Sequence, residues 1–196
     1  MNSATREAFG KALAELGATN PDIVSLDADL SCTTKSAIFA KAFPDRFFNM
    51  GIAEADLMGT AAGLATCNKI PFASTFAVFA TCRALDQIRN SICYPMLNVK
   101  VVGTHAGPSC GEDGGSHQAV EDIAIMRSLP HMVVVVPADD VEAKKVVYAA
   151  AECIGPMYLR FARLASPRCT MRATSLTCGM ARLCTRAAMW PSSLVA

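Results

Sequence analysis

The chain has 196 residues, of which 52% are hydrophobic and 18% are charged. This length and composition predict one domain, or one domain and a tail, with enough apolar side chains for a sizeable core. The formal net charge of +1 gives no electrostatic reason to expect nucleic acid or an anionic membrane as a partner. The sequence contains no apolar run of bilayer length and no stretch of the signal-peptide type at its start. We therefore expect a cytoplasmic protein.

The nine cysteines are an odd number and include no Cys-x-x-Cys pair. Zinc clusters and disulfide frameworks usually need paired spacings, so reduced cytosolic thiols fit this distribution better. We expect most of the cysteines to be small core residues.

Helical and extended patterns alternate along the first half of the chain. The apolar spacing predicts an amphipathic helix over residues 3–17. The elements expected after it are a strand over 23–26, a helix over about 34–42, a strand over 47–50, a helix over about 53–66, a strand over 70–73 and a helix over 78–92. The first strand ends in Asp27-Ala28-Asp29, a polar strand end of the kind at which open α/β sheets bind ligands.

The second half continues the alternation. Its expected elements are a strand over 99–103, an irregular stretch over 104–118, a helix over 119–128, a strand over 131–136, a helix over 140–153 and a strand over 157–161. Strands that alternate with helices through short turns predict an α/β fold with a doubly wound, mostly parallel sheet and helices on both faces. The sequence has no Gly-x-Gly-x-x-Gly or Walker loop, so we expect no glycine-rich turn that holds a diphosphate.

Two places attract attention for their chemistry. The stretch 104–118 contains four glycines, one proline, two histidines and two acidic residues, and long loops after strands commonly carry sites. Glu54 lies in the first turn of the predicted helix 53–66. An acidic residue at a helix start more often has a structural role, in which it caps N–H groups and complements the helix dipole, than a functional one. From the residue types alone, both a structural and a functional role remain open for Glu54 and for the stretch 104–118.

Three segments in this order resemble the pyrimidine-binding domain of transketolase. They are Asn49-Met50-Gly51-Ile52-Ala53-Glu54 at the start of a Gly/Ala-rich helix, Phe72-Ala73-Ser74-Thr75-Phe76-Ala77-Val78-Phe79, and Gly111-Glu112-Asp113-Gly114-Gly115-Ser116-His117-Gln118. The resemblance covers about residues 3–167 and looks like the separate C-terminal subunit of split bacterial and archaeal transketolases. It implies thiamine diphosphate as cofactor and transfer of a two-carbon ketol unit between sugar phosphates. It also implies an N-terminal partner subunit that holds the diphosphate with Mg²⁺ or Ca²⁺, and self-association in an α2β2 assembly.

The resemblance implies cofactor-side roles for four residues. Glu54 would hydrogen-bond a ring nitrogen of the aminopyrimidine and share a proton with it, which is a catalytic as well as a binding role. Phe76 and Phe79 would pack against the ring, with core packing as their alternative. Asp29 would lie near the thiazolium, with a cap at the strand end as its alternative. Cys82 stands where two-domain transketolases often have a tyrosine, which makes the expected ring contact less complete.

On the substrate side, the resemblance implies that His117 is catalytic and lies near the reacting carbon. Asp113 would accept a hydrogen bond from a sugar hydroxyl. His105 and Arg163 would contact the sugar phosphate, for which the flat, permanently charged guanidinium group is well suited. No residue of this chain is expected to bind the metal.

Residues 168–196 fit the resemblance poorly, because they contain four arginines, three cysteines and no acidic residue. Family members usually continue with an acidic segment and a third domain, and back-translation in another frame gives a segment of that kind. We therefore expect the domain to occupy residues 1–167. The tail over 168–196 would be either the out-of-frame product of a frameshift near codon 167 or a natural disordered end.

Three alternatives stand beside a split transketolase. Deoxyxylulose-phosphate synthases share the glutamate and a related Asp-Gly-x-x-His loop, and the beta subunits of 2-oxo-acid dehydrogenases share the fold and the glutamate. The third alternative is a non-catalytic truncated fragment that folds and self-associates. The Gly-Glu-Asp-Gly form of the loop over 111–114 favours transketolase.

Overall fold

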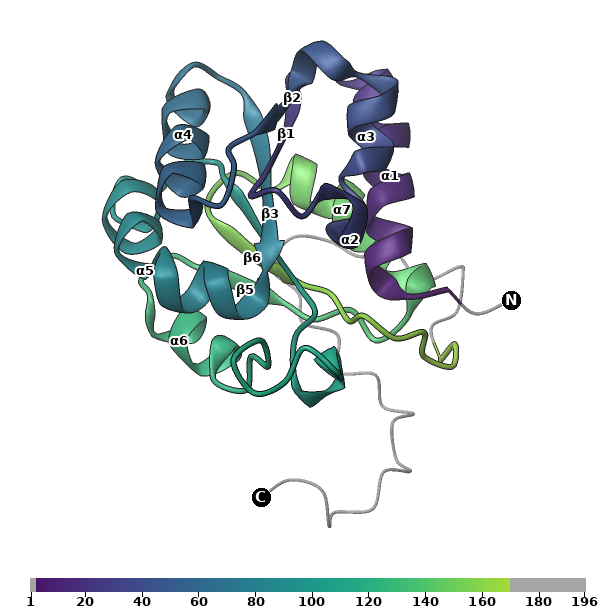
Figure 1. Ribbon diagram of the computed structural model, residues 1–196. Coiled ribbons are helices and arrows are strands. Elements are labelled where there is room, and N and C mark those ends of the chain that lie inside the picture. Colours follow the sequence, from purple (N-terminus) through teal and green to yellow (C-terminus); the bar gives the residue numbers. More distant parts are fainter. Residues whose placement is uncertain (1–2, 170–196) are drawn as a thin grey trace.

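The computed structural model describes residues 3–169, and over this range a six-stranded sheet forms the centre of the molecule (Figure 1). The strand order is β2-β1-β3-β4-β6-β5, and each neighbouring pair is parallel. The strands are β1 (Ile23–Asp27), β2 (Phe47–Asn49), β3 (Ile70–Phe76), β4 (Lys100–Thr104), β5 (Val133–Val135) and β6 (Met157–Arg160). This sheet confirms the predicted doubly wound α/β fold.

Helices cover both faces of the sheet (Figure 1). The α-helices are α1 (Thr5–Thr19), α2 (Ser31–Thr34), α3 (Ala37–Ala42), α4 (Glu54–Thr66), α5 (Leu85–Gln87), α6 (Asp122–Ser128) and α7 (Asp140–Glu152). Four short helical segments of other types are η1 (Pro44–Arg46), η2 (Phe79–Arg83), η3 (Ile88–Cys93) and η4 (Pro108–Cys110). None of the helices in the described range has the length and apolar character that crossing a membrane requires.

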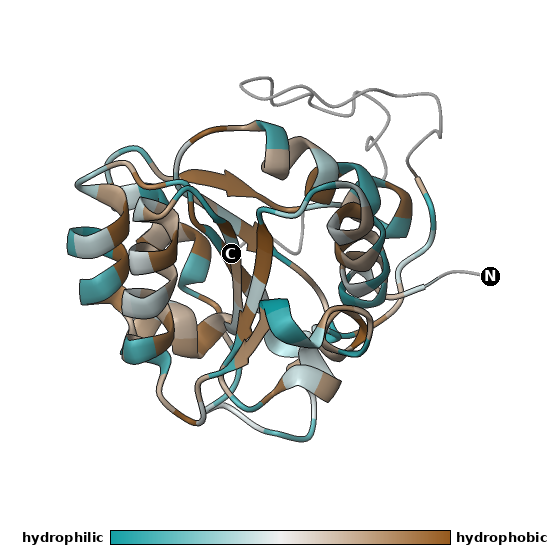
Figure 2. Ribbon diagram, turned by 90° about the horizontal axis from the view of Figure 1, so that it is seen from above, coloured by the Kyte–Doolittle hydropathy of each residue, from teal (hydrophilic) through white to brown (hydrophobic). Residues whose placement is uncertain are grey.

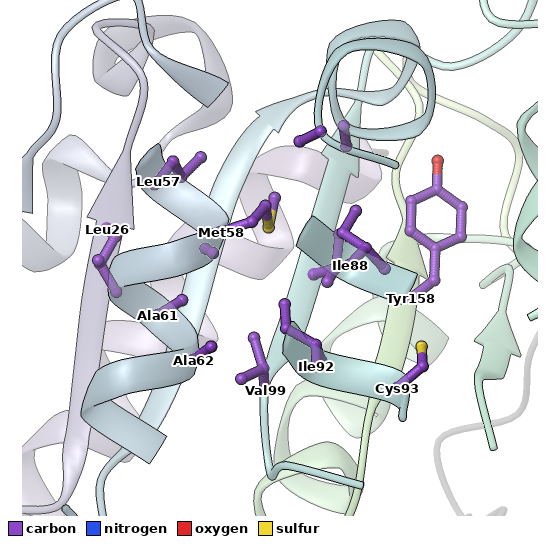
Figure 3. Close-up of a cluster of buried hydrophobic side chains, with 14 of the residues drawn as sticks. Leu26, Leu57, Met58, Ala61, Ala62, Ile88, Ile92, Cys93, Val99 and Tyr158 are labelled. Carbon is purple, nitrogen blue, oxygen red and sulfur yellow. The ribbon is translucent and has the colours of Figure 1, made fainter. Parts of the chain in front are cut away.

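The core has two layers because successive strand residues point to opposite faces of the sheet. On β4, Val101 joins the layer under α4, η3 and α6, whereas Val102 joins the layer under α1, α3 and α7. In Figure 2 the apolar strands run between these two helical layers. Figure 3 shows the first layer, in which Ile88 of η3 lies between Met58 of α4 and Tyr158 of β6.

The strand order reverses direction at β1. The chain passes from β1 to β2 on one side and then returns to β3 on the other side. In open α/β sheets, ligands bind outside the carboxyl ends of the strands at such a reversal point. The fold therefore indicates a site at the carboxyl ends of β1 and β3, next to the start of α4.

The helix predicted over about 34–42 is confirmed as α3, which begins later than predicted because the helical conformation is interrupted at Lys35. Lys35 has a φ of 73°, in the left-handed region, and separates α2 from α3. The buried carboxylate of Asp27 accepts hydrogen bonds from the hydroxyl groups of Thr34 at 2.7 Å and Ser36 at 2.8 Å. These side-chain bonds compete with the regular helical pattern and fix the break.

The segment predicted as a helix over 78–92 is helical, but it is not one regular α-helix. The segment consists of the π-helical η2, the short α5 and the π-helical η3. The hydroxyl of Thr81 in η2 donates to Ala77 O at 2.8 Å, a back-bond of the kind that distorts helices. Wide helical turns occur frequently at functional sites, and this segment directly follows β3.

Two further expectations concern the cysteines and the tail. Of the seven cysteines in the described range, Cys93, Cys110 and Cys153 are buried and the other four are exposed, so a core position holds for fewer than half of these seven. In the predicted tail, the guanidinium group of Arg168 pairs with the carboxylate of Asp140. The rest of that tail, residues 170–196, lies outside the described residues.

Candidate functional site

Four of the predicted site residues follow the carboxyl ends of neighbouring strands. Asp29 follows β1, Glu54 begins the helix after β2, Phe79 follows β3 and His105 follows β4. Because the strands are parallel and adjacent, these ends share one edge of the sheet. The fold therefore brings together residues that the sequence separates widely.

Glu54 is a buried carboxylate at the first residue of α4, with 5% of its surface exposed. Its Oε1 accepts a hydrogen bond from Arg83 Nη1 at 3.1 Å. The guanidinium carbon of Arg83 lies 4.1 Å from the centre of the Phe79 ring, which is a cation–π distance. Glu54 is thus linked through Arg83 to the aromatic residues after β3.

Phe76 and Phe79 form an aromatic wall with two histidines beside it. The two phenyl rings are nearly parallel, with centroids 5.7 Å apart and an angle of 14° between their planes. His105 stacks on Phe76 at 4.1 Å, and His117 meets the edge of Phe79 at 5.2 Å. Phe76 and Phe79 are each at least 91% buried, so the wall is mostly dry.

His105 is held in a single protonation state by its neighbours. Arg6 Nη1 lies 3.1 Å from His105 Nε2, and Thr104 Oγ1 lies 3.0 Å from His105 Nδ1. Arginine has only donors, so Nε2 accepts and Nδ1 carries the proton. Burial, together with the smaller effect of the positive charges of Arg6 and Arg163, lowers the pKa of His105 to about 4. The imidazole is therefore neutral at neutral pH.

Arg163 ties the 104–118 loop to the segment after β6. Its Nη1 lies 3.0 Å from an oxygen of Asp113 and also donates to Cys110 O, while its Nη2 lies 3.2 Å from an oxygen of Glu112. The ring nitrogen Nδ1 of His117 lies 2.9 Å from Ser116 Oγ. Asp113 and His117 of the loop and the guanidinium group of Arg163 thus lie at the same edge as the aromatic wall.

Asp29 is fixed by Asn49 at the ends of β1 and β2. Asn49 Oδ1 accepts from the backbone N–H groups of Asp29 at 3.1 Å and Gly51 at 3.0 Å, and its amide nitrogen donates to Asp29 Oδ1 at 3.1 Å. Asp29 itself has a φ of 61°, which is uncommon for a residue with a side chain. Its described hydrogen bonds reach Asn49 and not the aromatic wall.

Sequence reasoning missed two arginines of this site. Arg6 lies in the first turn of α1, where a cation opposes the helix dipole, and this unfavourable placement was the available signal. Its Nε is buried and has no hydrogen-bond partner among the described residues. Arg83 follows Cys82, the position predicted to leave the ring contact incomplete. Cys82 is exposed and lies 3.7 Å from a carboxylate oxygen of Glu121.

The fold and this edge define a doubly wound α/β domain with a carboxylate and an aromatic wall at its reversal point. Residues 2–168 match the family described as transketolase, pyrimidine binding domain. The chain therefore belongs to the transketolase pyrimidine-binding domain family.

Known relatives agree with this assignment. A protein of Methanocaldococcus jannaschii named as a transketolase C-terminal section is 55% identical over 81% of this chain and 50% of its own length. Human transketolase is 45% identical over 82% of this chain and 26% of its own length. A solved structure described as a split gene transketolase, inactive beta4 tetramer, has a TM-score of 0.80 and 59% identity over 90% of this chain and 57% of that one. The chain thus spans about half the length of the archaeal relative, and less of the human one.

Proposed function

We propose that this chain is the pyrimidine-binding part of a split transketolase. It would transfer a two-carbon ketol unit between sugar phosphates with thiamine diphosphate, and would be active only with an N-terminal partner subunit. The observation that carries the proposal is the buried carboxylate of Glu54 beside the Phe76–Phe79 wall, at the reversal point of the sheet. Membership of the transketolase family supports the same reading.

The residues present fit an aminopyrimidine ring. A nearly dry carboxylate can share a proton with a ring nitrogen, and a flat aromatic wall holds a flat ring at low entropic cost. When bound, thiamine diphosphate supplies the carbon–carbon bond chemistry. Glu54 would orient the ring and hold the shared proton, and Phe76 and Phe79 would exclude water from it. Asp29, held by Asn49, would lie toward the thiazolium.

The substrate side is suited to a phosphorylated sugar. Arg6, His105 and Arg163 would bind the phosphate, because the two guanidinium groups place positive charge around the imidazole. Asp113 would accept a hydrogen bond from a sugar hydroxyl. His117 would stabilise charge or move a proton at the reacting carbon, from its place against the edge of Phe79. Arg163 would exchange its pairing with Glu112 for the phosphate.

The size of the relatives supports a partner subunit. The archaeal relative is twice as long as the segment it shares with this chain, and the human one is about four times as long. The solved split-gene relative is described as a beta4 tetramer and as inactive. We propose that this chain likewise self-associates, and that an N-terminal subunit supplies the diphosphate site with its Mg²⁺ or Ca²⁺.

Replacing Glu54 with glutamine tests the proposal. We expect Glu54→Gln to lower kcat by about 100-fold or more, because the amide keeps the shape but cannot share the proton. The measurement is a coupled assay with a ketose phosphate donor, in which the chain is combined with its cognate N-terminal section. Asp56→Asn is the matched control, because it removes an exposed carboxylate from the same turn of α4.

Three outcomes would contradict the proposal in different ways. A Glu54→Gln complex with full activity would remove Glu54 from the mechanism. A wild-type complex that prefers pyruvate as donor would favour the synthase or dehydrogenase alternatives. Normal binding of the partner without turnover of any donor would favour a non-catalytic fragment.

A further inference from the structure

Arg83 makes two contacts that a flat aromatic cation would make. Its Nη1 donates to Glu54 Oε1 at 3.1 Å, and its guanidinium carbon lies 4.1 Å from the centre of the Phe79 ring. A guanidinium group is planar, positively charged and edged with N–H donors. Its face can therefore stack on a ring while its edge pairs with a carboxylate.

These contacts involve the same two partners that the proposed function gives to the aminopyrimidine. That ring would also stack on Phe79 and hydrogen-bond Glu54 from its edge. One face of a phenyl ring and one buried carboxylate oxygen cannot serve both groups at once. Bound cofactor and the observed position of Arg83 therefore exclude each other.

We propose that Arg83 is a placeholder for the aminopyrimidine ring, an inference that rests on the proposed function. In the cofactor-free chain the Arg83 side chain occupies the ring position, and it withdraws when the cofactor binds. The side chain of Glu54 is only 6% exposed, and a buried carboxylate without a partner is costly, so the placeholder keeps it paired until the cofactor arrives.

The surroundings of Arg83 allow it to leave. Its side chain is 54% exposed, so the guanidinium group can move into water without crossing the core. Arg83 is the last residue of the π-helical η2, in which the hydroxyl of Thr81 donates to Ala77 O. Ala84 lacks regular helical backbone angles and separates Arg83 from the start of α5. An exposed partner also limits the strength of the ion pair, because solvent screens it.

The placeholder lowers the apparent affinity for the cofactor, because only the fraction of molecules with the site open can bind. Removal of the guanidinium group should therefore tighten binding of thiamine diphosphate, by about five- to tenfold if the closed form makes up about 80–90% of the molecules. A residue that contacts the bound cofactor would show the opposite effect.

The experiment is calorimetry on the complex of this chain with its cognate N-terminal section, titrated with thiamine diphosphate in the presence of Mg²⁺. We expect Arg83→Gln to lower Kd by about five- to tenfold. Arg83→Lys should lie between Arg83→Gln and wild type, because it keeps the charge and loses the flat face. Arg89→Gln is the control on the neighbouring η3, where Arg89 bonds the side chain of Asn90, and should match wild type.

Binding by wild type with an equal or weaker affinity in Arg83→Gln would overturn the placeholder and leave the proposed function standing. No binding by the wild-type complex would overturn the proposed function and the placeholder with it. A second readout needs no cofactor: urea unfolding of wild type, Glu54→Gln, Arg83→Gln and the double variant. Coupling between the two positions supports the ion pair, and strictly additive effects contradict it.

Discussion

At position 105, the imidazole is engaged through both ring nitrogens and is 1% exposed. Its backbone has a φ of 57°, in the left-handed region, which turns the chain sharply at the end of β4. Burial, with a contribution from the two nearby arginines, lowers its pKa to about 4. The folded chain therefore keeps this ring neutral at pH values just below 6.5, at which an ordinary histidine takes up a proton.

This difference predicts a loss of stability in mild acid. Below an ordinary pKa of 6.5 the unfolded chain binds a proton at His105, whereas the folded chain does not until about 4. The contribution of His105 is therefore fully present above pH 6.5 and is lost as the pH falls from about 6.5 to about 4. Urea unfolding at several pH values in this window should show wild type losing stability faster than His105→Gln. Parallel curves for the two proteins would contradict the assignment.

Some residues of the site could be predicted from the sequence, and others could not. Glu54 and His117 lie in short motifs that carry the family resemblance, so they could be picked out from the sequence. The contacts of Arg83 and Arg6 with the site could not be predicted, because only the fold brings these two residues to it. Arg83 pairs with a residue 29 positions away, and Arg6 approaches His105 across 99 positions.

At the scale of elements, Lys100 joins the start of β4 to the end of α7. It is fully buried, and its ammonium group donates to Asn98 Oδ1 at 2.7 Å, Cys153 O at 2.6 Å and Gly155 O at 2.9 Å. Burial lowers the pKa of Lys100 to about 7. The three acceptors match the three N–H donors of the ammonium group, so these hydrogen bonds hold the start of β4 against the end of α7.

We expect Lys100→Met to lower the free energy of unfolding by about 2–4 kcal/mol, because three acceptors lose their donor. Lys69→Met is the matched control, since Lys69 pairs with Asp22 on the surface and should cost less than about 1 kcal/mol. Urea unfolding at pH 6 measures both. Equal effects of the two substitutions would show that the buried hydrogen bonds of Lys100 do not stabilise the fold.

Elements with strong patterns were predicted well, and elements shaped by side-chain hydrogen bonds were not. The nearly continuous apolar run at β4 and the Gly/Ala-rich α4 follow from the sequence directly. The break at Lys35 depends on the buried carboxylate of Asp27, which accepts hydrogen bonds from both sides of the break. The irregular turns of η2 depend on the hydroxyl of Thr81. Apolar periodicity carries no information about such bonds, so it predicts longer and more regular helices.

At the scale of the whole molecule, we propose that the partner subunit meets this chain at the sheet edge that gathers the site residues. The described residues at this edge include a buried carboxylate, an aromatic wall and the guanidinium groups of Arg6 and Arg163. Among them, no three His, Cys, Asp or Glu side chains converge to hold a metal ion. The proposed N-terminal subunit would bring the diphosphate and its metal to this edge, so that one cofactor lies between two polypeptides.

The most direct test of this account is calorimetric titration of thiamine diphosphate and Mg²⁺ into the chain alone and into its mixture with the cognate N-terminal section. We predict saturable binding in the mixture, at about one cofactor per chain, and none to either polypeptide alone. Binding would weaken in Glu54→Gln and stay unchanged in Asp56→Asn. Tight binding to this chain alone, or no binding in the mixture, would contradict a cofactor site shared between two subunits.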